Sequence, residues 1–123
     1  MYDKDNIFAK IARGEIPAKK VYENEYALSF YDINPAAAKH VLIIPKGRFS
    51  NIYEFVVHAT AEEQGGFWQA FRETADILGV QNDFNVLANA GCGTFADQTV
   101  YHFHLHLFSG ERLKGYEEWS QKK

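Results

Sequence analysis

Three of the five histidines occupy alternate positions in one short segment, Tyr101-His102-Phe103-His104-Leu105-His106-Leu107-Phe108. Successive side chains of a β-strand point to opposite faces, so the alternation places three imidazoles on one face and the apolar residues between them on the other. A face that merely met water would normally carry Thr, Lys, Glu or Gln, and three protonated imidazoles would repel one another. The segment therefore predicts a strand over 100–108 with one face in the core and one face available for chemistry.

Metal binding is one interpretation of these histidines, because His-x-His pairs often supply ligands to zinc or iron. One ion cannot take all three. His102 and His106 are about 13 Å apart between Cα atoms on a strand, whereas donor atoms lie ~2 Å from zinc. Two of them could bind with outside help, but the sequence has no cysteine pair, no HExxH motif and no carboxylate within the strand. We therefore expect neither a metal nor another cofactor.

Imidazole chemistry on a phosphate group fits the pattern best. Neutral histidine is a nucleophile and proton carrier near pH 7, and protonated histidine binds anions. A phosphorus centre under attack needs a nucleophile, a group that fixes the tautomer of that nucleophile, and donors for the non-bridging oxygens. Imidazoles at ~6.6 Å intervals can divide these roles. A neutral nucleophile also implies that activity falls as the pH drops below ~6.

Periodicity and capping signals predict the other elements. The chain reads as a short helix over 5–13, a hairpin over 21–31, and strands over 40–45 and 84–89. The capping-box pattern Thr60-Ala61-Glu62-Glu63 predicts the start of a long helix that ends at Gly79. Gly65-Gly66 in its first turns implies either close packing or fraying. Strands in consecutive blocks favour an α+β domain with a mostly antiparallel sheet.

Composition limits the class of protein. A chain of 123 residues with 46% hydrophobic residues is enough for one domain over 1–123. The formal net charge of −3 argues against bulk capture of nucleic acid. No window approaches the ~20 apolar residues of a membrane span, and the first residues are polar, unlike a signal peptide. The single cysteine, Cys92, excludes an internal disulfide, so we expect a cytoplasmic protein with no membrane or nucleic-acid partner.

The segment 102–108 matches the His-φ-His-φ-His-φ-φ signature (φ, apolar) of the histidine triad (HIT) superfamily, and the chain most resembles its Hint branch. The match extends to Ile7-Phe8-Ala9-Lys10-Ile11, Gly14-Glu15-Ile16-Pro17, Phe30-Tyr31-Asp32-Ile33-Asn34-Pro35, His40-Val41-Leu42-Ile43-Ile44-Pro45-Lys46, Asn89 and Gln98-Thr99-Val100. The resemblance implies a HIT-like fold, with a mostly antiparallel five-stranded sheet, one long and one short helix, and two copies paired as a homodimer with a ten-stranded sheet.

The resemblance also implies an activity, hydrolysis or transfer of a nucleoside monophosphate, typically from a purine nucleoside phosphoramidate, through a nucleotidyl-histidine intermediate. His104 matches the nucleophile and His106 the histidine that contacts the phosphate oxygens. The histidine that matches His40 lies against the nucleophile and orients it. His102, at the first triad position, supports this network from behind.

The expected nucleotide contacts follow from the same resemblance. Asp32 matches the acid that binds the ribose, although from the residues alone it reads equally well as a turn residue before Asn34-Pro35. Ile33 matches a nucleoside contact. The phosphate and leaving-group contacts match Asn89, Asp97, Gln98 and Thr99, with Asp97 standing where Hint proteins usually have glycine.

Two further departures from the family pattern, and two alternative functions, follow from the sequence. Asn6, Ala9 and Arg48 stand where many bacterial relatives carry the ligands of a structural zinc, so none is expected. The segment 109–116 differs from the usual pattern and leaves the leaving group open. Other HIT branches imply cleavage of dinucleoside polyphosphates or nucleotidyl transfer. The same pocket also suits a nucleotide-binding module without catalysis.

Overall fold

The computed structural model describes residues 2–92, 96 and 98–110; Asp97 and most of the expected tail determinants of 109–116 lie outside them. The elements in chain order are α1 (Ile7–Ala12), β1 (Lys20–Glu23), β2 (Ala27–Tyr31), β3 (Lys39–Pro45), α2 (Ile52–His58), α3 (Ala61–Leu78), β4 (Asn85–Leu87) and β5 (Leu105–Ser109). The strands form one sheet in the order β1-β2-β3-β5-β4, and every neighbouring pair is antiparallel. The predicted α+β class with a five-stranded antiparallel sheet is confirmed.

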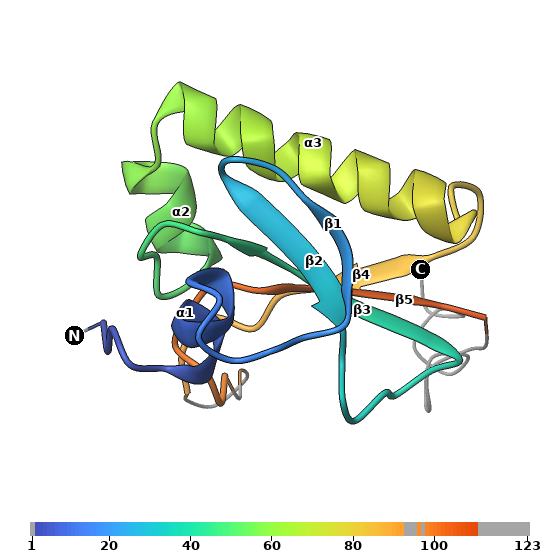
Figure 1. Ribbon diagram of the computed structural model, residues 1–123, viewed down its shortest axis with the longest axis horizontal. Helices are drawn as coiled ribbons and strands as arrows, with labels where there is room; N and C mark the ends of the chain where they lie inside the picture. Colours follow the sequence, from blue (N-terminus) through green and yellow to red (C-terminus); the bar gives the residue numbers. More distant parts are fainter. Residues whose placement is uncertain (1, 93–95, 97, 111–123) are drawn as a thin grey trace.

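The helix α3 lies on one face of the sheet and α1 on the other (Figure 1), and each face carries a hydrophobic core. On one face α3 packs over side chains that include Ala27, Ile43 and Leu107. On the other face Ile11 of α1 packs against Leu28, Phe30, Leu42 and Ile44. β3 is buried along nearly its whole length, which explains its continuous run of apolar residues.

Two expectations about the elements are wrong. The sequence predicts one short helix, whereas the structure has a second short helix, α2. The side chain of Asn51 caps its first turn by accepting from the amide of Glu54. The strand expected over 100–108 begins only at Leu105. Continuing the β3–β5 register would bring Phe103 opposite Pro45, and proline has no N–H to extend the ladder. Phe103 instead donates to the carbonyl of Phe49 at 2.7 Å.

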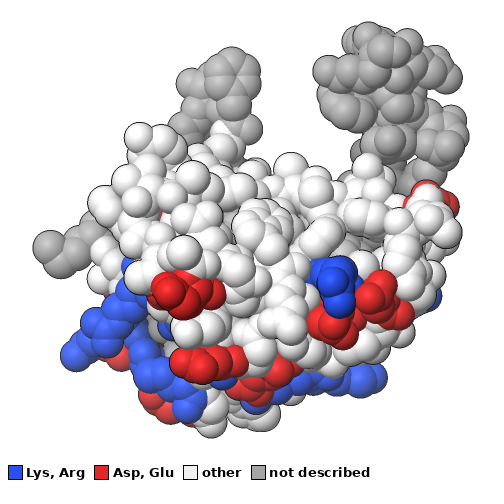
Figure 2. Space-filling model, turned by 90° about the horizontal axis from the view of Figure 1, so that it is seen from above, with Lys and Arg blue, Asp and Glu red and all other residues white. Residues whose placement is uncertain are grey.

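The long helix begins and ends as its sequence predicts. Thr60 and Glu63 make both hydrogen bonds of the capping box, at 3.0 and 3.1 Å, and Gly79 ends the helix with φ of 70°. Seen from the α3 side, charged side chains gather in the lower half of the view and the surface above them is largely uncharged (Figure 2). None of the helices in the described part of the chain is long and apolar enough to cross a bilayer.

The two glycines at the start of α3 have different surroundings. A Cβ at Gly66 would lie 2.6–2.9 Å from side-chain atoms of Tyr26, whereas a Cβ at Gly65 would meet nothing within 4 Å. The side chain of Asn24 also donates to the carbonyl of Gly66 at 2.9 Å. Close packing is therefore the reason for Gly66, and Gly65 has no steric reason to be glycine.

This difference predicts opposite effects of one substitution at adjacent positions. Gly65→Ala should raise the free energy of unfolding by about 0.5–1 kcal/mol, because alanine favours the helix. Gly66→Ala should lower it by about 1–3 kcal/mol, because the new methyl group collides with Tyr26. Urea denaturation of both variants checks this. Equal effects of the two substitutions would contradict the packing described here.

Candidate active site

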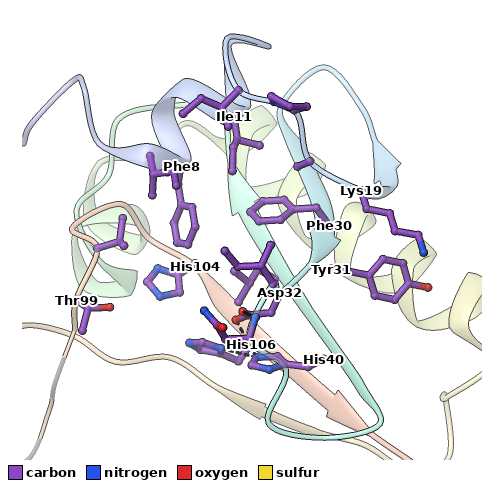
Figure 3. Close-up of a pocket in the computed structure, with 18 residues that line it drawn as sticks. Phe8, Ile11, Lys19, Phe30, Tyr31, Asp32, His40, Thr99, His104 and His106 are labelled. Carbon is purple, nitrogen blue, oxygen red and sulfur yellow. Dashed lines mark hydrogen bonds and ion pairs between the residues drawn. The ribbon is translucent and has the colours of Figure 1, made fainter.

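Side chains of the triad segment lie on two opposite faces of the sheet, although only His106 of the three histidines lies in β5. Phe103, Leu105 and Leu107 pack into the core on the α3 face. His104 and His106 line a cavity on the opposite face, below α1 (Figure 3). The sequence therefore predicted correctly that His104 and His106 share the face opposite the apolar side chains, whereas His102, expected on the same accessible face, is buried and does not line the cavity.

The cavity has a volume of about 770 Å³ and two chemically different ends. Its apolar end is formed by side chains of α1 and the sheet, which are Ile7, Phe8, Ile11, Phe30 and Leu42. Its polar end carries Asp32, His40, Thr99, His104 and His106. In Figure 3 the rings of Phe8 and Phe30 lie above the imidazoles, and the ring of Phe8 lies directly against His104. Such a cavity suits a ligand with a flat apolar part and an anionic part.

His104 is held in one tautomer by the main chain. Its Nδ1 lies 2.7 Å from the carbonyl oxygen of His102, and a carbonyl only accepts, so Nδ1 must carry the proton. Nε2 is then the nitrogen with a lone pair. The ring is 7% exposed and packs edge-on against Phe8, with centroids 4.8 Å apart. Burial lowers the pKa of His104, partly opposed by its bond to the His102 carbonyl, so the ring is neutral near pH 7.

The His102 ring lies behind this arrangement and is fully buried. Its Nε2 donates to the carbonyl of Pro45 at 2.8 Å, so its Nδ1 accepts from the hydroxyl of Tyr2 at 2.6 Å. Burial lowers the pKa of His102 to about 4. His102 thus supports the nucleophile through its carbonyl, as well as by filling the space behind. Tyr2 was missed by the sequence analysis, because nothing local links residues one hundred positions apart.

His40 contacts His106, and the contact with His104 that the resemblance implied is not formed. Nδ1 of His40 accepts from the amide of Ala36 at 3.0 Å, so Nε2 carries the proton. That proton is donated to Nδ1 of His106 at 2.9 Å, which leaves the proton of His106 on Nε2. Burial lowers the pKa of His106 to about 4, and the neighbouring imidazoles act in the same direction. Burial also lowers the pKa of His40, against the raising effect of Asp32.

The sheet register explains why these side chains meet. Asp32 follows β2 and donates its amide to the carbonyl of His40 at 3.0 Å, which places the two residues side by side. On the next strand, His106 lies opposite Leu42 and therefore diagonal to His40. Three neighbouring strands thus deliver one carboxylate and two imidazoles to one point.

The same point is the best candidate for a metal. The donor atoms of Asp32, His40 and His106 all lie within 4.8 Å of one another. Asp32 and His40 are thus candidate ligands from outside the triad segment, which the sequence did not reveal. The hydrogen bond at His40 argues against a cation, however. A metal-bound histidine donates the proton of its other ring nitrogen, whereas Nδ1 of His40 accepts a proton from Ala36. The three residues fit a hydrogen-bonded network better than a metal site.

The other expected nucleotide contacts fall into two groups. Asp32, Ile33 and Thr99 line the cavity, and Ile33 is 87% exposed. Asn89 and Gln98 are not among the lining residues. The buried side chain of Gln98 donates to the carbonyls of Ser50 and Val100 and accepts from the amide of Gly91. Gln98 therefore ties the loop before the triad to the segment before α2.

Comparison with known proteins gives consistent relatives. Residues 13–113 match the family profile of the HIT domain. A HIT-like protein of Azospirillum brasilense, itself uncharacterised, is 47% identical over 113 residues, which cover 91% of this chain and 91% of that protein.

Solved structures agree with this. A HIT family hydrolase from Clostridium thermocellum has a TM-score of 0.77 at 35% identity, over 89% of this chain and 93% of its own. A histidine triad nucleotide-binding protein from Candida albicans has a TM-score of 0.72 at 27% identity, over 96% of this chain and 92% of its own. Because the profile spans most of the sequence and includes all three alternate histidines, the chain is a member of the HIT family.

Proposed function

We propose that this protein is a nucleotide hydrolase or nucleotidyl transferase that cleaves a purine nucleoside phosphoramidate at the α-phosphorus. The observation that carries the proposal is the fixed tautomer of His104, whose Nε2 is an unprotonated nitrogen in a cavity with an apolar end. An imidazole with one nitrogen committed to a carbonyl is prepared to attack with the other. The names of the hydrolase and nucleotide-binding relatives support the same reading.

The residues divide the reaction as follows. The purine occupies the apolar end beside Phe8 and Phe30, and Asp32 accepts from the ribose hydroxyls. Nε2 of His104 forms a bond to phosphorus while the P–N bond to the amine breaks, and the leaving amine takes a proton from solvent water, which the water that later attacks phosphorus returns. Nε2–H of His106 donates to a non-bridging oxygen. Water then attacks phosphorus, and the bond to His104 breaks to release the monophosphate.

Removing the nucleophile tests the proposal directly. His104→Ala should lower kcat on adenosine 5′-phosphoramidate at least about 1000-fold, while calorimetry still detects binding of adenosine monophosphate. His58→Ala is the matched control, because His58 lies on α2 and pairs with Glu54. Turnover by His104→Ala at the normal rate would remove the mechanism. A faster reaction of the natural chain on a diadenosine polyphosphate would favour another HIT branch.

The lowered pKa values predict where activity is lost in acid. A histidine whose pKa lies below its ordinary ~6.5 stays neutral to lower pH. The acid limb of kcat/KM should therefore lie below the ordinary ~6.5, given the lowered pKa of His104 and the values of about 4 for His102 and His106. Initial rates above and below this pH, with circular dichroism to exclude unfolding, check the prediction. An acid limb at 6.5 or above contradicts it.

The proposal includes a homodimer. β4 is an edge strand of the sheet, and exposed edges are prone to pair. Val86 and Leu87 on this strand are 47% and 48% exposed, and Trp68 and Ile77 of α3 are 43% and 57% exposed. The uncharged surface seen from the α3 side is the kind of surface that a second copy covers (Figure 2).

A charge at the edge strand tests the dimer. Sedimentation should give twice the mass of one chain for the natural protein, and Leu87→Glu should shift it to the mass of a single chain, because a buried unpaired carboxylate is costly. Val57→Glu on α2, at a position 52% exposed, is the control and should leave the mass unchanged. A natural protein that sediments as one chain at micromolar concentration refutes the dimer.

A further inference from the structure

The hydroxyl of Tyr2 bonds to a buried nitrogen behind the nucleophile. Its oxygen lies 2.6 Å from Nδ1 of His102, and the centroids of the two rings are 5.7 Å apart. The His102 ring is fully buried and donates its one proton to the carbonyl of Pro45, so Nδ1 can only accept. Burial raises the pKa of Tyr2, which keeps the proton on its hydroxyl. Among the described residues, no group other than this hydroxyl bonds to Nδ1 of His102.

His102 contacts the nucleophile through its main chain. Its carbonyl accepts from Nδ1 of His104 at 2.7 Å, and the N–H of the same peptide group, which belongs to Phe103, donates to the carbonyl of Phe49 at 2.7 Å. A peptide group is planar, so the direction of this carbonyl depends on how the residues at both ends are held. The Phe103 ring anchors one end in the core. The buried His102 ring, with its bond to Tyr2, anchors the other.

Without the Tyr2 hydroxyl, the His102 ring has no arrangement that satisfies both of its nitrogens. If Nε2 keeps the proton, Nδ1 is a buried acceptor without a donor, which is unfavourable. If the proton moves to Nδ1, the lone pair of Nε2 faces the carbonyl oxygen of Pro45, which is also an acceptor. A second proton is disfavoured, because burial lowers the pKa of His102 to about 4. Each arrangement favours movement of the ring, and the carbonyl of the same residue moves with it.

The Tyr2 hydroxyl reaches the nucleophile from outside the cavity. Tyr2 is not one of the residues that line the cavity, whereas α1, which follows it in the chain, forms part of the apolar end. Phe8 of α1 packs edge-on against His104, with centroids 4.8 Å apart. Removal of the hydroxyl alone therefore leaves every lining residue in the cavity unchanged in identity, and its effect must pass through His102.

We propose that Tyr2 is a positioning residue for the nucleophile: its hydroxyl fixes the His102 ring, and through the His102 carbonyl it keeps the proton of His104 on Nδ1. This rests on the proposed function. When the carbonyl is displaced, either nitrogen of His104 can carry the proton, and a ring with the proton on Nε2 cannot attack phosphorus. Loss of the hydroxyl therefore lowers the fraction of reactive enzyme and leaves nucleotide binding as it is.

The kinetic test is Tyr2→Phe, which removes the hydroxyl and keeps the ring. On adenosine 5′-phosphoramidate kcat should fall about 10- to 100-fold, the effect of a small misplacement of a reacting group, while KM stays as in the natural protein. Tyr53→Phe is the matched control, because Tyr53 lies on α2 and is 69% exposed. It should leave both constants unchanged. A normal kcat in Tyr2→Phe, or a rise in KM alone, overturns the proposal.

A double substitution shows whether Tyr2 acts through His102. His102→Gln places an amide near the position of Nε2, so it can still donate to Pro45, but it has no acceptor at the position of Nδ1. In this background Tyr2→Phe should cause no further loss of kcat. An equal loss of kcat in both backgrounds means that Tyr2 acts by another route, and the proposal then fails.

Nitrogen-15 NMR of the histidine rings tests the same point without turnover. The natural protein should carry the proton of His102 on Nε2 and that of His104 on Nδ1, and Tyr2→Phe should show both tautomers of His104. A proton on Nδ1 of His102 in the natural protein, or one unchanged His104 tautomer in Tyr2→Phe, overturns the role of Tyr2 and leaves the proposed function standing. The expected tautomer shift, in a protein whose natural form does not hydrolyse the phosphoramidate, supports the effect of Tyr2 on His104 and overturns the proposed function.

Discussion

The hydrogen bond from Nδ1 of His104 to the carbonyl of His102 determines the chemistry of the cavity. The ring of His104 reaches the carbonyl two residues earlier in the segment that immediately precedes β5. Phe103 fixes that backbone by packing its ring into the core and donating its amide to Phe49. The nucleophile is thus oriented by the same residues that attach the segment to the fold.

Backbone groups set the tautomers of the other imidazoles as well. Pro45 accepts from His102, and Ala36 donates to His40, which in turn fixes His106. A backbone partner cannot rotate away or change its protonation state. The tautomer of each ring is therefore fixed before a ligand binds. The arrangement depends on β3 and β5 being neighbours, because β3 contributes His40 and Pro45 while the triad segment contributes the rest. Fold and site therefore depend on one strand pairing.

Local patterns account for what could be predicted from the sequence. Alternation identified His104 and His106 as side chains that share a face, and the capping box identified the start of α3. Contacts between distant segments could not be predicted. These are the hydrogen bond between Tyr2 and His102, the hydrogen bond between His40 and His106, and the strand register that starts β5 at Leu105. The helix α2 was missed although Asn51 caps it and although Ile52, Phe55 and Val56 recur at helical spacing.

Burial of the imidazoles has opposite consequences for catalysis and for stability. It keeps the site neutral and nucleophilic at pH values where a free histidine is half protonated. In the folded protein His102 and His106 have pKa values of about 4, whereas in the unfolded chain a histidine has a pKa of about 6.5. Above about pH 6.5 both states are neutral and stability is unaffected, whereas between about 6.5 and 4 the unfolded state binds more protons and stability falls as the pH falls. Because His102 packs behind the nucleophile and carries its carbonyl partner, the chain cannot relieve this acid sensitivity by exposing the ring without also releasing His104.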